Sequence, residues 1–336
     1  MIKIKNIYYM LSYAFQTLND KGYNKIATED FVNTADLFAE ILIIGISRQI
    51  KQGLVKDYIE ISETTSSPHG KINISKSMDT FHLKRVNCSY DDFSINCYLN
   101  QILKSTLHIL IKSDIDNNRK KRLKKVLFYF SDVDLLDVSN INWKIRYDRN
   151  NQNYRMLLGI CYLTVNSLLL SESKGKIKLM EFLDDQRMSR LYEKFLLNYY
   201  IKEHPEIHVS SPQIKWQLDN DFDFMLPKMQ TDISLRNRGR LLIIDAKYYA
   251  KSTQKNWGVK TIHSQNLYQI FTYVKNKDVE FDGEVSGMLL YAKSDSDELD
   301  NEYNMSGNKI SVKTLDLNQD FNQIRQQLDE IVEKYL

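Results

Sequence analysis

The chain has 336 residues, of which 43% are hydrophobic and 26% are charged, and its formal net charge is +3 at pH 7. These values are typical of a globular protein with room for two cores, and they exclude a disordered or low-complexity chain. We expect no signal peptide, because the first residues carry no apolar stretch of the required kind. The most apolar segment, residues 156–170, is interrupted by three polar side chains and falls short of the roughly 20 apolar residues of a membrane span. The three cysteines fit neither a disulfide framework nor a CxxC site, so we expect a cytoplasmic protein with no membrane partner.

The first half of the chain alternates between helical and strand-like patterns. Apolar residues at helical spacing predict helices over residues 6–18, 31–53, 93–112, 119–130 and 154–171. We expect Thr28 to cap the second of these helices and Gly53 to end it. Alternating polar and apolar residues predict strands over residues 55–64, 71–75 and 81–88. Residues 1–175 are therefore predicted to form an α+β domain.

The character of the sequence changes near residues 173–176, and we expect a second domain over residues 176–336. Helical patterns cover residues 181–203, 264–275 and 320–336. Strand patterns cover residues 206–210, 214–218, 222–226, 230–235, 241–248, 285–292 and 309–315. This succession predicts an α/β domain built on a mixed sheet that is flanked by helices.

A run of basic residues begins one of the helices of the first domain. Six of the seven residues from Arg119 to Lys125 are Lys or Arg. Such a run suits contacts with phosphate groups, and a solvated helix face is the alternative interpretation.

The segment from Met229 to Tyr249 carries the most distinctive pattern of the sequence. Two apolar runs flank a turn-like segment, residues 236–240, that contains Asn and Gly, which predicts a β-hairpin. If Arg236 pairs with Leu241, the antiparallel register places Asp232 opposite Asp245, with Cβ atoms about 4.5–5.5 Å apart. Lys247 follows Asp245 by two residues, so its side chain points to the same face of the sheet.

Two carboxylates and one ammonium group on one small area have a defined chemistry. Carboxylate oxygens are hard ligands that suit Mg²⁺, and Mn²⁺ is possible in the same site. A bound metal lowers the pKa of a water ligand, and an ammonium group can orient that water or stabilise the developing negative charge. Asp232, Asp245 and Lys247 therefore predict a metal-dependent phosphodiesterase.

The same residues resemble a known nuclease family. An Asp followed by Asp-Ala-Lys on consecutive strands is similar to the pattern of the PD-(D/E)xK nucleases. Within that superfamily, residues 231–233 and 243–249 resemble the McrC-like nuclease subunits of McrBC-type restriction systems. The specific resemblance covers roughly residues 180–280, and Thr231 stands where the wider superfamily usually has Pro.

The resemblance implies further site residues. Glu193, on the helix before the sheet, would complete a metal site with Asp232 and Asp245. Gln265, on the helix after the hairpin, would be a catalytic residue of a QxxxY-type element, and Gln269 is the alternative for that role.

The resemblance also implies an activity and partners. It implies a Mg²⁺-dependent endonuclease that cleaves double-stranded DNA as part of a restriction system, together with a hexameric AAA+ GTPase of the McrB type. The domain over residues 1–175 would contact this GTPase and stimulate its GTP hydrolysis. The chain has no G-x-x-x-x-G-K-[ST] motif, so nucleotide hydrolysis would belong to the second protein.

Two other functions fit the same sequence. One is a stand-alone structure-specific or repair nuclease of the same superfamily. The other is a non-catalytic assembly subunit, in which the acidic residues only pair with Lys and Arg side chains.

Overall fold

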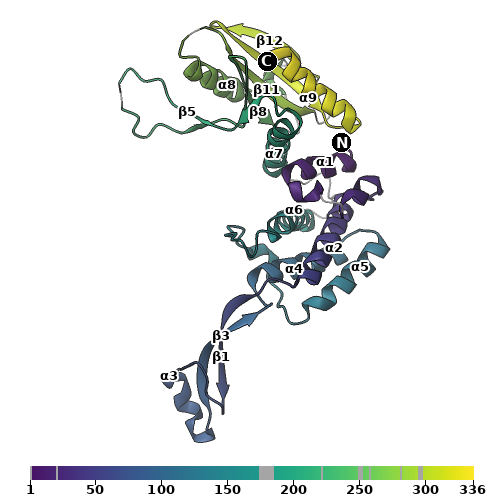
Figure 1. The fold of residues 1–336 in the computed structure, drawn as a ribbon, viewed down its shortest axis with the longest axis vertical. Helices are drawn as coiled ribbons and strands as arrows, with labels where there is room; N and C mark the ends of the chain where they lie inside the picture. The colour runs from purple at the N-terminus through teal and green to yellow at the C-terminus, as the bar shows by residue number, and fades with distance from the viewer. Residues whose placement is uncertain are drawn as a thin grey trace. The chain divides into compact units, whose positions relative to one another are not determined.

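The computed structural model describes residues 2–19, 22–173, 185–220, 222–248, 253–256, 259–280, 282–293 and 298–336 (Figure 1). The chain divides into two compact units. The sheet unit comprises Met1–Thr28 and Leu183–Leu336, and the helical unit comprises Glu29–Phe182. This division differs from the predicted domains 1–175 and 176–336, because the first 28 residues fold with the second half of the chain.

The described part of the sheet unit is built on a six-stranded mixed sheet, as the strand patterns predicted. Its strands, in spatial order, are β12 (Asp300–Met305), β13 (Asn308–Asp316), β11 (Val285–Lys293), β8 (Arg240–Lys247), β7 (Ile233–Asn237) and β4 (His208–Ser210). Strand β11 runs parallel to β8 and β13, and the other neighbouring pairs are antiparallel. Two short antiparallel pairs lie outside this sheet: β5 (Gln213–Ile214) with β6 (Met229–Gln230), and β9 (Thr253–Asn256) with β10 (Val259–Ile262).

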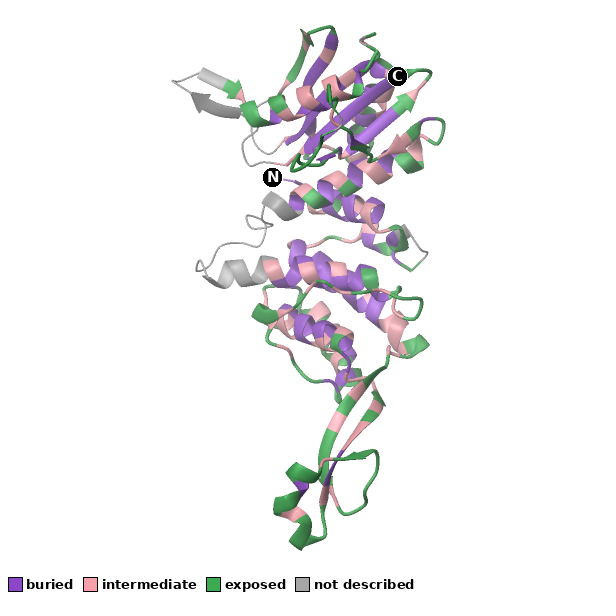
Figure 2. Cartoon of the chain, turned by 90° about the vertical axis from the view of Figure 1, so that its left-hand side faces the viewer, coloured by how far each residue is buried: buried purple, intermediate pink, exposed green. Residues whose placement is uncertain are grey.

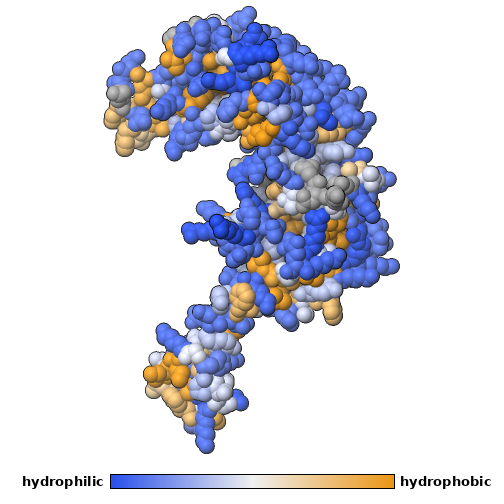
Figure 3. Space-filling model, in the orientation of Figure 1, coloured by the Kyte–Doolittle hydropathy of each residue, from blue (hydrophilic) through white to orange (hydrophobic). Residues whose placement is uncertain are grey.

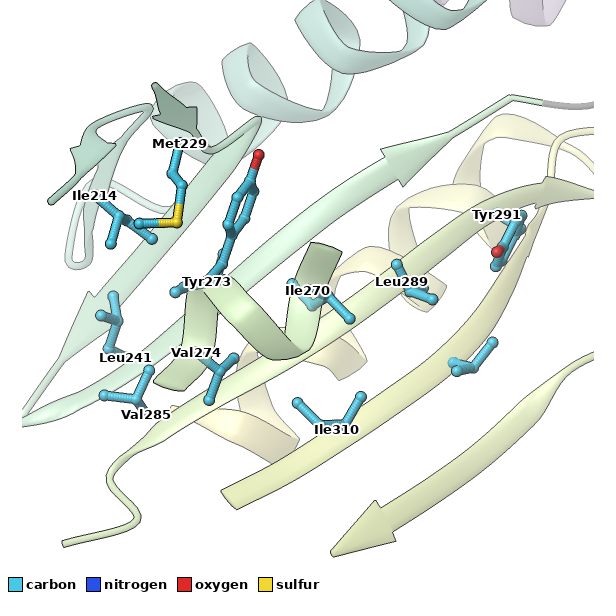
Figure 4. Packing of buried hydrophobic residues seen from close by; sticks show 12 residues of the cluster. Ile214, Met229, Leu241, Ile270, Tyr273, Val274, Val285, Leu289, Tyr291 and Ile310 are labelled. Carbon is cyan, nitrogen blue, oxygen red and sulfur yellow. The ribbon is translucent and has the colours of Figure 1, made fainter. Parts of the chain in front are cut away.

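Helix α8 (Ser264–Lys277) covers one face of the sheet (Figure 4). Its buried residues pack on alternate residues of β8, β11 and β13, because successive side chains of a strand point to opposite faces. Gly287 in β11 lies directly beneath this helix. A Cβ atom at that position would lie 2.7 Å from Val274 Cγ2 and 2.8 Å from Ile270 Cγ1, so the absent side chain lets helix and strand approach closely.

Helices α7 (Asp185–Glu203) and α9 (Phe321–Tyr335) belong to the other side of the sheet. Ile310 and Val312 of β13 face the cluster under α8, so Ser311 between them points the opposite way. The Ser311 hydroxyl lies 2.7 Å from the Tyr335 hydroxyl on α9. Tyr200 of α7 in turn donates a hydrogen bond to a backbone carbonyl of α9, at Leu328, over 3.4 Å.

Helix α1 (Ile4–Ala14) explains why the first residues belong to the sheet unit. The Tyr9 ring stacks on Phe321, with ring centroids 4.3 Å apart. The Asn6 side-chain amide donates to two backbone carbonyls just before α9, those of Leu317 and Gln319, over 2.8 and 2.7 Å. Two short 3-10 segments, η1 (Gln16–Asn19) and η2 (Asn24–Thr28), follow α1.

As far as the structure describes it, the helical unit packs four long helices and carries a β-hairpin. The helices are α2 (Thr34–Gln52), α4 (Tyr98–Lys112), α5 (Asn117–Leu127) and α6 (Tyr154–Ser173). The hairpin arm consists of β1 (Asp57–Thr65) paired with β3 (Val86–Ser94), with β2 (Lys71–Ile72), α3 (Ile74–Ser77) and η3 (Met78–Leu83) between them. Short 3-10 turns, η4 (Phe128–Phe130) and η5 (Val138–Asn140), follow α5. Burial is concentrated in the helices, while much of the arm is exposed (Figure 2).

Several local predictions were wrong. Asn33, not Thr28, caps α2: its side chain accepts a hydrogen bond from the Asp36 backbone. The predicted strand over residues 81–88 begins only at Val86, because residues 78–83 form η3. Residues 222–226 lie in an exposed turn instead of a strand, and β12 had no sequence prediction. None of the described helices has the length and apolarity needed to cross a membrane.

Candidate active site

The β7–β8 hairpin has the predicted register. Arg236 pairs with Leu241, and the ladder continues to Ile233 opposite Ile244. The turn needs two left-handed residues, supplied by Arg238 at φ +47° and Gly239 at φ +93°. Asp232 lies directly before β7, where the register continues to Asp245.

The hairpin brings Asp232, Asp245 and Lys247 together. Lys247 Nζ lies 2.8 Å from Asp245 Oδ2, and Asp232 Oδ2 accepts a hydrogen bond of 2.9 Å from the Ala246 backbone. The Asp245 side chain is 2% exposed and that of Lys247 is 15% exposed. Water therefore screens these charges poorly, and they interact strongly.

The two carboxylates share a single nearby cation. Lys247 Nζ pairs with the buried Oδ2 atom of Asp245, and Asp232 receives its hydrogen bond from the Ala246 backbone, so the site carries two acids beside one ammonium group. Burial raises the pKa of Asp245, against the opposing effect of Lys247, and the neighbouring Asp232 raises it further. Burial also raises the pKa of Asp232. A cation bound between the two carboxylates would favour the ionised form of both and would lower their pKa values.

Helix α8 provides a second contact that holds Lys247. Its ammonium group donates to Gln269 Oε1 over 3.2 Å, and Gln269 Nε2 donates to the Tyr273 hydroxyl over 3.0 Å. Gln269 thus fixes the lysine between a carboxylate and an amide. Gln265, which the sequence favoured for a catalytic role, lies one turn earlier on α8 and is exposed.

Glu193 lies on α7 and points along its own helix. Its Oε1 atom accepts a hydrogen bond of 3.1 Å from Ser189, four residues earlier. Burial raises the pKa of Glu193, and the charge of Asp232 raises it further. Across the described ranges, no group of three Asp, Glu, His or Cys side chains is placed to hold a metal ion. The structure therefore brings Asp232 and Asp245 together and leaves Glu193 outside a shared ligand group.

Two carboxylates are nevertheless sufficient for one class of cation. Mg²⁺ keeps several of its waters and is usually bound through one or two carboxylates, with phosphate oxygens of the substrate as further ligands. The buried Asp245 carboxylate and the neighbouring Asp232, with only one ammonium group between them, fit such an ion. Sequence reasoning missed Ser189 and the Ala246 backbone as partners of the acids, although the four-residue spacing of Ser189 and Glu193 was visible in the sequence.

Comparisons with known proteins place the chain among restriction systems. The model of a family described as "McrBC 5-methylcytosine restriction system component" matches residues 3–292. The chain is 28% identical, over 344 residues, to the "Type IV methyl-directed restriction enzyme EcoKMcrBC" of Escherichia coli (strain K12), covering 100% of this chain and 99% of that protein. A solved assembly of Thermococcus gammatolerans McrB AAA+ hexamers with bound McrC aligns with a TM-score of 0.48 and 14% identity, over 95% of this chain and 75% of that chain. The Thermococcus gammatolerans McrBC complex aligns with a TM-score of 0.41 and 14% identity, over 59% of this chain and 58% of that chain.

Proposed function

Because this chain belongs to the family of McrBC 5-methylcytosine restriction system components, we propose that it is the DNA-cleaving subunit of such a system. In this proposal the sheet unit is a nuclease of the PD-(D/E)xK type. Full-length similarity to a restriction enzyme of Escherichia coli supports this proposal.

The observation that carries the proposal is the cluster of Asp232, Asp245 and Lys247 at one end of the β7–β8 hairpin. Two carboxylates close together repel each other, and burial strengthens that repulsion because water screens it poorly. Here Asp245 is buried beside Asp232, and both burial and the neighbouring acid raise the pKa of Asp245, although Lys247 pairs with it at 2.8 Å. Two acids with one cation are unfavourable for stability alone and suit the binding of a further cation.

Each residue of the cluster has a separate role in the proposed hydrolysis of a phosphodiester. Asp232 and Asp245 would hold Mg²⁺, which supplies an activated water and neutralises phosphate charge when it is bound. Lys247 stands beside Asp245 with its ammonium fixed by Gln269, so it can hold the attacking water or stabilise the charge that develops on the phosphate oxygens. Glu193 on α7 lies close enough to Asp232 for the charge of Asp232 to raise its pKa, and its role as a further metal ligand stays a prediction.

Metal binding gives a test that does not depend on cleavage. We expect calorimetric titration of the full chain with Mg²⁺ or Mn²⁺ to show binding that Asp245→Ala abolishes. Asp316→Ala is the matched control, because Asp316 lies in another strand of the same sheet and also pairs with a lysine, Lys293, over 3.2 Å. Absence of metal binding by the wild type, or equal binding by Asp245→Ala, would overturn the metal site.

The helical unit is the proposed contact with a second protein, an AAA+ GTPase of the McrB type whose GTP hydrolysis it stimulates. Exposed apolar side chains gather at the far end of the β1–β3 arm (Figure 3). Ile74, Met78 and Phe81 there are 68%, 69% and 51% exposed. Clustered apolar side chains in solvent are characteristic of interaction sites.

A capture experiment tests this contact. The full chain with Ile74→Asp and Phe81→Asp should lose capture of the GTPase encoded in the same restriction system. Val32→Asp is the control, because Val32 is 69% exposed in the same unit but lies outside the arm. Unchanged capture by the double variant would refute the role of the arm.

A further inference from the structure

Helix α5 contains the basic run, and its two sides have different chemistry. Arg119 and Arg122 face α2, which lies beside α5 in the helical unit (Figure 1). Arg119 donates to Asp36 Oδ2 over 2.7 Å and to Glu29 Oε2 over 2.8 Å. Arg122 makes two hydrogen bonds to the carboxylate of Glu40, of 2.6 and 2.8 Å. These two cations are thus neutralised within the fold.

The opposite side of α5 carries cations that the fold does not neutralise. Lys121, Lys124 and Lys125 are exposed, and in the described ranges none of them is within ion-pair distance of an acidic side chain. Their spacing of three and four residues places them on one stripe of the helix. The segment from residue 117 to 130 has no Asp or Glu, so the stripe receives no opposite charge from its own helix.

Two aromatic side chains extend this stripe. Phe128 follows Lys121 by seven residues and Lys124 by four, and it is 81% exposed. Tyr129 beside it is 56% exposed, with the two ring centroids 6.2 Å apart. A helix face that only contacts solvent does not explain the exposure of Phe128. Leaving its ring in water forgoes roughly 1.5–3 kcal/mol of the free energy that burying the ring would provide. Exposed cations beside exposed aromatic rings instead form a surface that suits a partner with both anionic and apolar groups, such as the phosphates and sugars of DNA.

We propose that the outer face of α5 and η4, formed by Lys121, Lys124 and Lys125 of α5 and by Phe128 and Tyr129 of η4, binds DNA. The three ammonium groups contact backbone phosphates, and the two rings pack against the sugars of the same backbone. Charge complementarity selects this occupant, since duplex DNA presents a phosphate charge about every 1.7 Å of its axis. The inference rests on the proposed function, which makes DNA the substrate, and it assigns the helical unit a share in holding that substrate.

The size of the effect follows from counterion release. The logarithm of the DNA association constant falls linearly with the logarithm of the salt concentration, and each phosphate contact adds about 0.9 to the steepness of that fall. Three contacts therefore add about 2.7. Their loss should reduce that slope by about 2–3 and weaken binding at 50 mM salt by about tenfold or more. Aromatic contacts release no counterions, so Phe128→Ala with Tyr129→Ala should weaken binding and leave the slope unchanged.

Fluorescence anisotropy with a labelled 30-base-pair duplex in EDTA measures both quantities for the full chain, because EDTA prevents cleavage. The test variant combines Lys121→Ala, Lys124→Ala and Lys125→Ala. The control combines Lys51→Ala, Lys56→Ala and Lys144→Ala, which removes the same charge from exposed positions elsewhere in the helical unit. Both variants should keep the wild-type thermal midpoint, because all six side chains are exposed.

The inference requires a loss of affinity and slope in the α5 variant and none in the control. It is overturned if the wild type does not bind the duplex at 50 mM salt, or if both variants bind alike. It is also overturned if the α5 variant binds DNA normally but no longer captures the GTPase, which would assign the face to an acidic protein surface.

Cleavage separates this result from the proposed function. If the wild type does not cut DNA in the presence of the GTPase, GTP and Mg²⁺, while the α5 variant loses DNA affinity, the α5 inference stands and the nuclease proposal falls. If the wild type cuts and the α5 variant binds DNA unchanged, the nuclease proposal stands and the inference falls.

Discussion

Replacing Tyr13 by Ala should destabilise the sheet unit and leave the helical unit unchanged. Tyr13 on α1 is 7% exposed, and its ring centroid lies 5.7 Å from that of Phe195 on α7 and 5.9 Å from that of Phe321 on α9. Its hydroxyl donates to Glu203 Oε1 over 2.8 Å. Truncating a buried ring of this size costs about 3–5 kcal/mol. Tyr13→Phe keeps the ring and loses only the hydrogen bond to a charged group, at about 1.5–3 kcal/mol.

Hydrogen exchange followed by mass spectrometry is the suitable assay, because a chain of two units has no single free energy of unfolding. A loss of 3 kcal/mol corresponds to exchange about 100-fold faster for amides that exchange through opening of the sheet unit. We expect this increase in peptides of α7 and α9, and none in α2 and α4. Tyr58→Ala, at a tyrosine that is 69% exposed on the arm, should change neither set. Unchanged protection of α7 and α9 in Tyr13→Ala, or loss of protection in α2 and α4 instead, would refute the assignment of α1 to the sheet unit.

Three further predictions concern packing and charge. Gly287→Ala should lower the stability of the sheet unit by about 1–3 kcal/mol, measured by the same exchange experiment, because the new methyl group overpacks the contact beneath α8; an unchanged protection pattern would contradict this. Arg119→Ala should destabilise the helical unit by about 3–5 kcal/mol, because it leaves the fully buried carboxylate of Asp36 without its cation, and wild-type protection of α2 would refute it. Hydrogen bonding from Lys334 lowers the pKa of Glu302 to about 2 from its ordinary 4.5. The ionised Glu302 carboxylate therefore stabilises the folded state fully above pH 4.5, and this stabilisation is lost as the pH falls through 2. Wild type and Glu302→Gln should therefore differ in the thermal midpoint of the sheet unit at pH 6 and converge toward pH 2, and a difference independent of pH would contradict the assignment.

The sequence predicted the register of the β7–β8 hairpin correctly because hairpin geometry is local. A turn of fixed length and a side-chain period of two determine the register from Arg236 and Leu241, and the structure has that register. The choice between Gln265 and Gln269 was not local. Both lie on one face of α8, and only the packing angle of that helix on the sheet decides that Gln269 contacts Lys247.

Other features depended on contacts between distant parts of the chain. Nothing in the pattern of residues 6–18 indicates that α1 packs on helices that begin at residues 185 and 321. The basic run was ambiguous because sequence spacing does not show that Arg119 and Arg122 meet the acids of α2 while the lysines remain exposed. Strand β12 escaped prediction because it is an edge strand with mostly exposed residues, which lack the alternation of a half-buried strand.

DNA cleavage by the chain reconstituted with its GTPase, GTP and Mg²⁺ tests the central claim most directly. Lys247→Ala should reduce the cleavage rate by about 10²–10³-fold, the usual cost of removing one group that stabilises transition-state charge. Lys293→Ala provides the matched comparison, because Lys293 also ends a strand of the same sheet beside an aspartate but lies outside the proposed site. The account predicts wild-type cleavage by Lys293→Ala and wild-type capture of the GTPase by both variants. Cleavage by Lys247→Ala at the wild-type rate would contradict it.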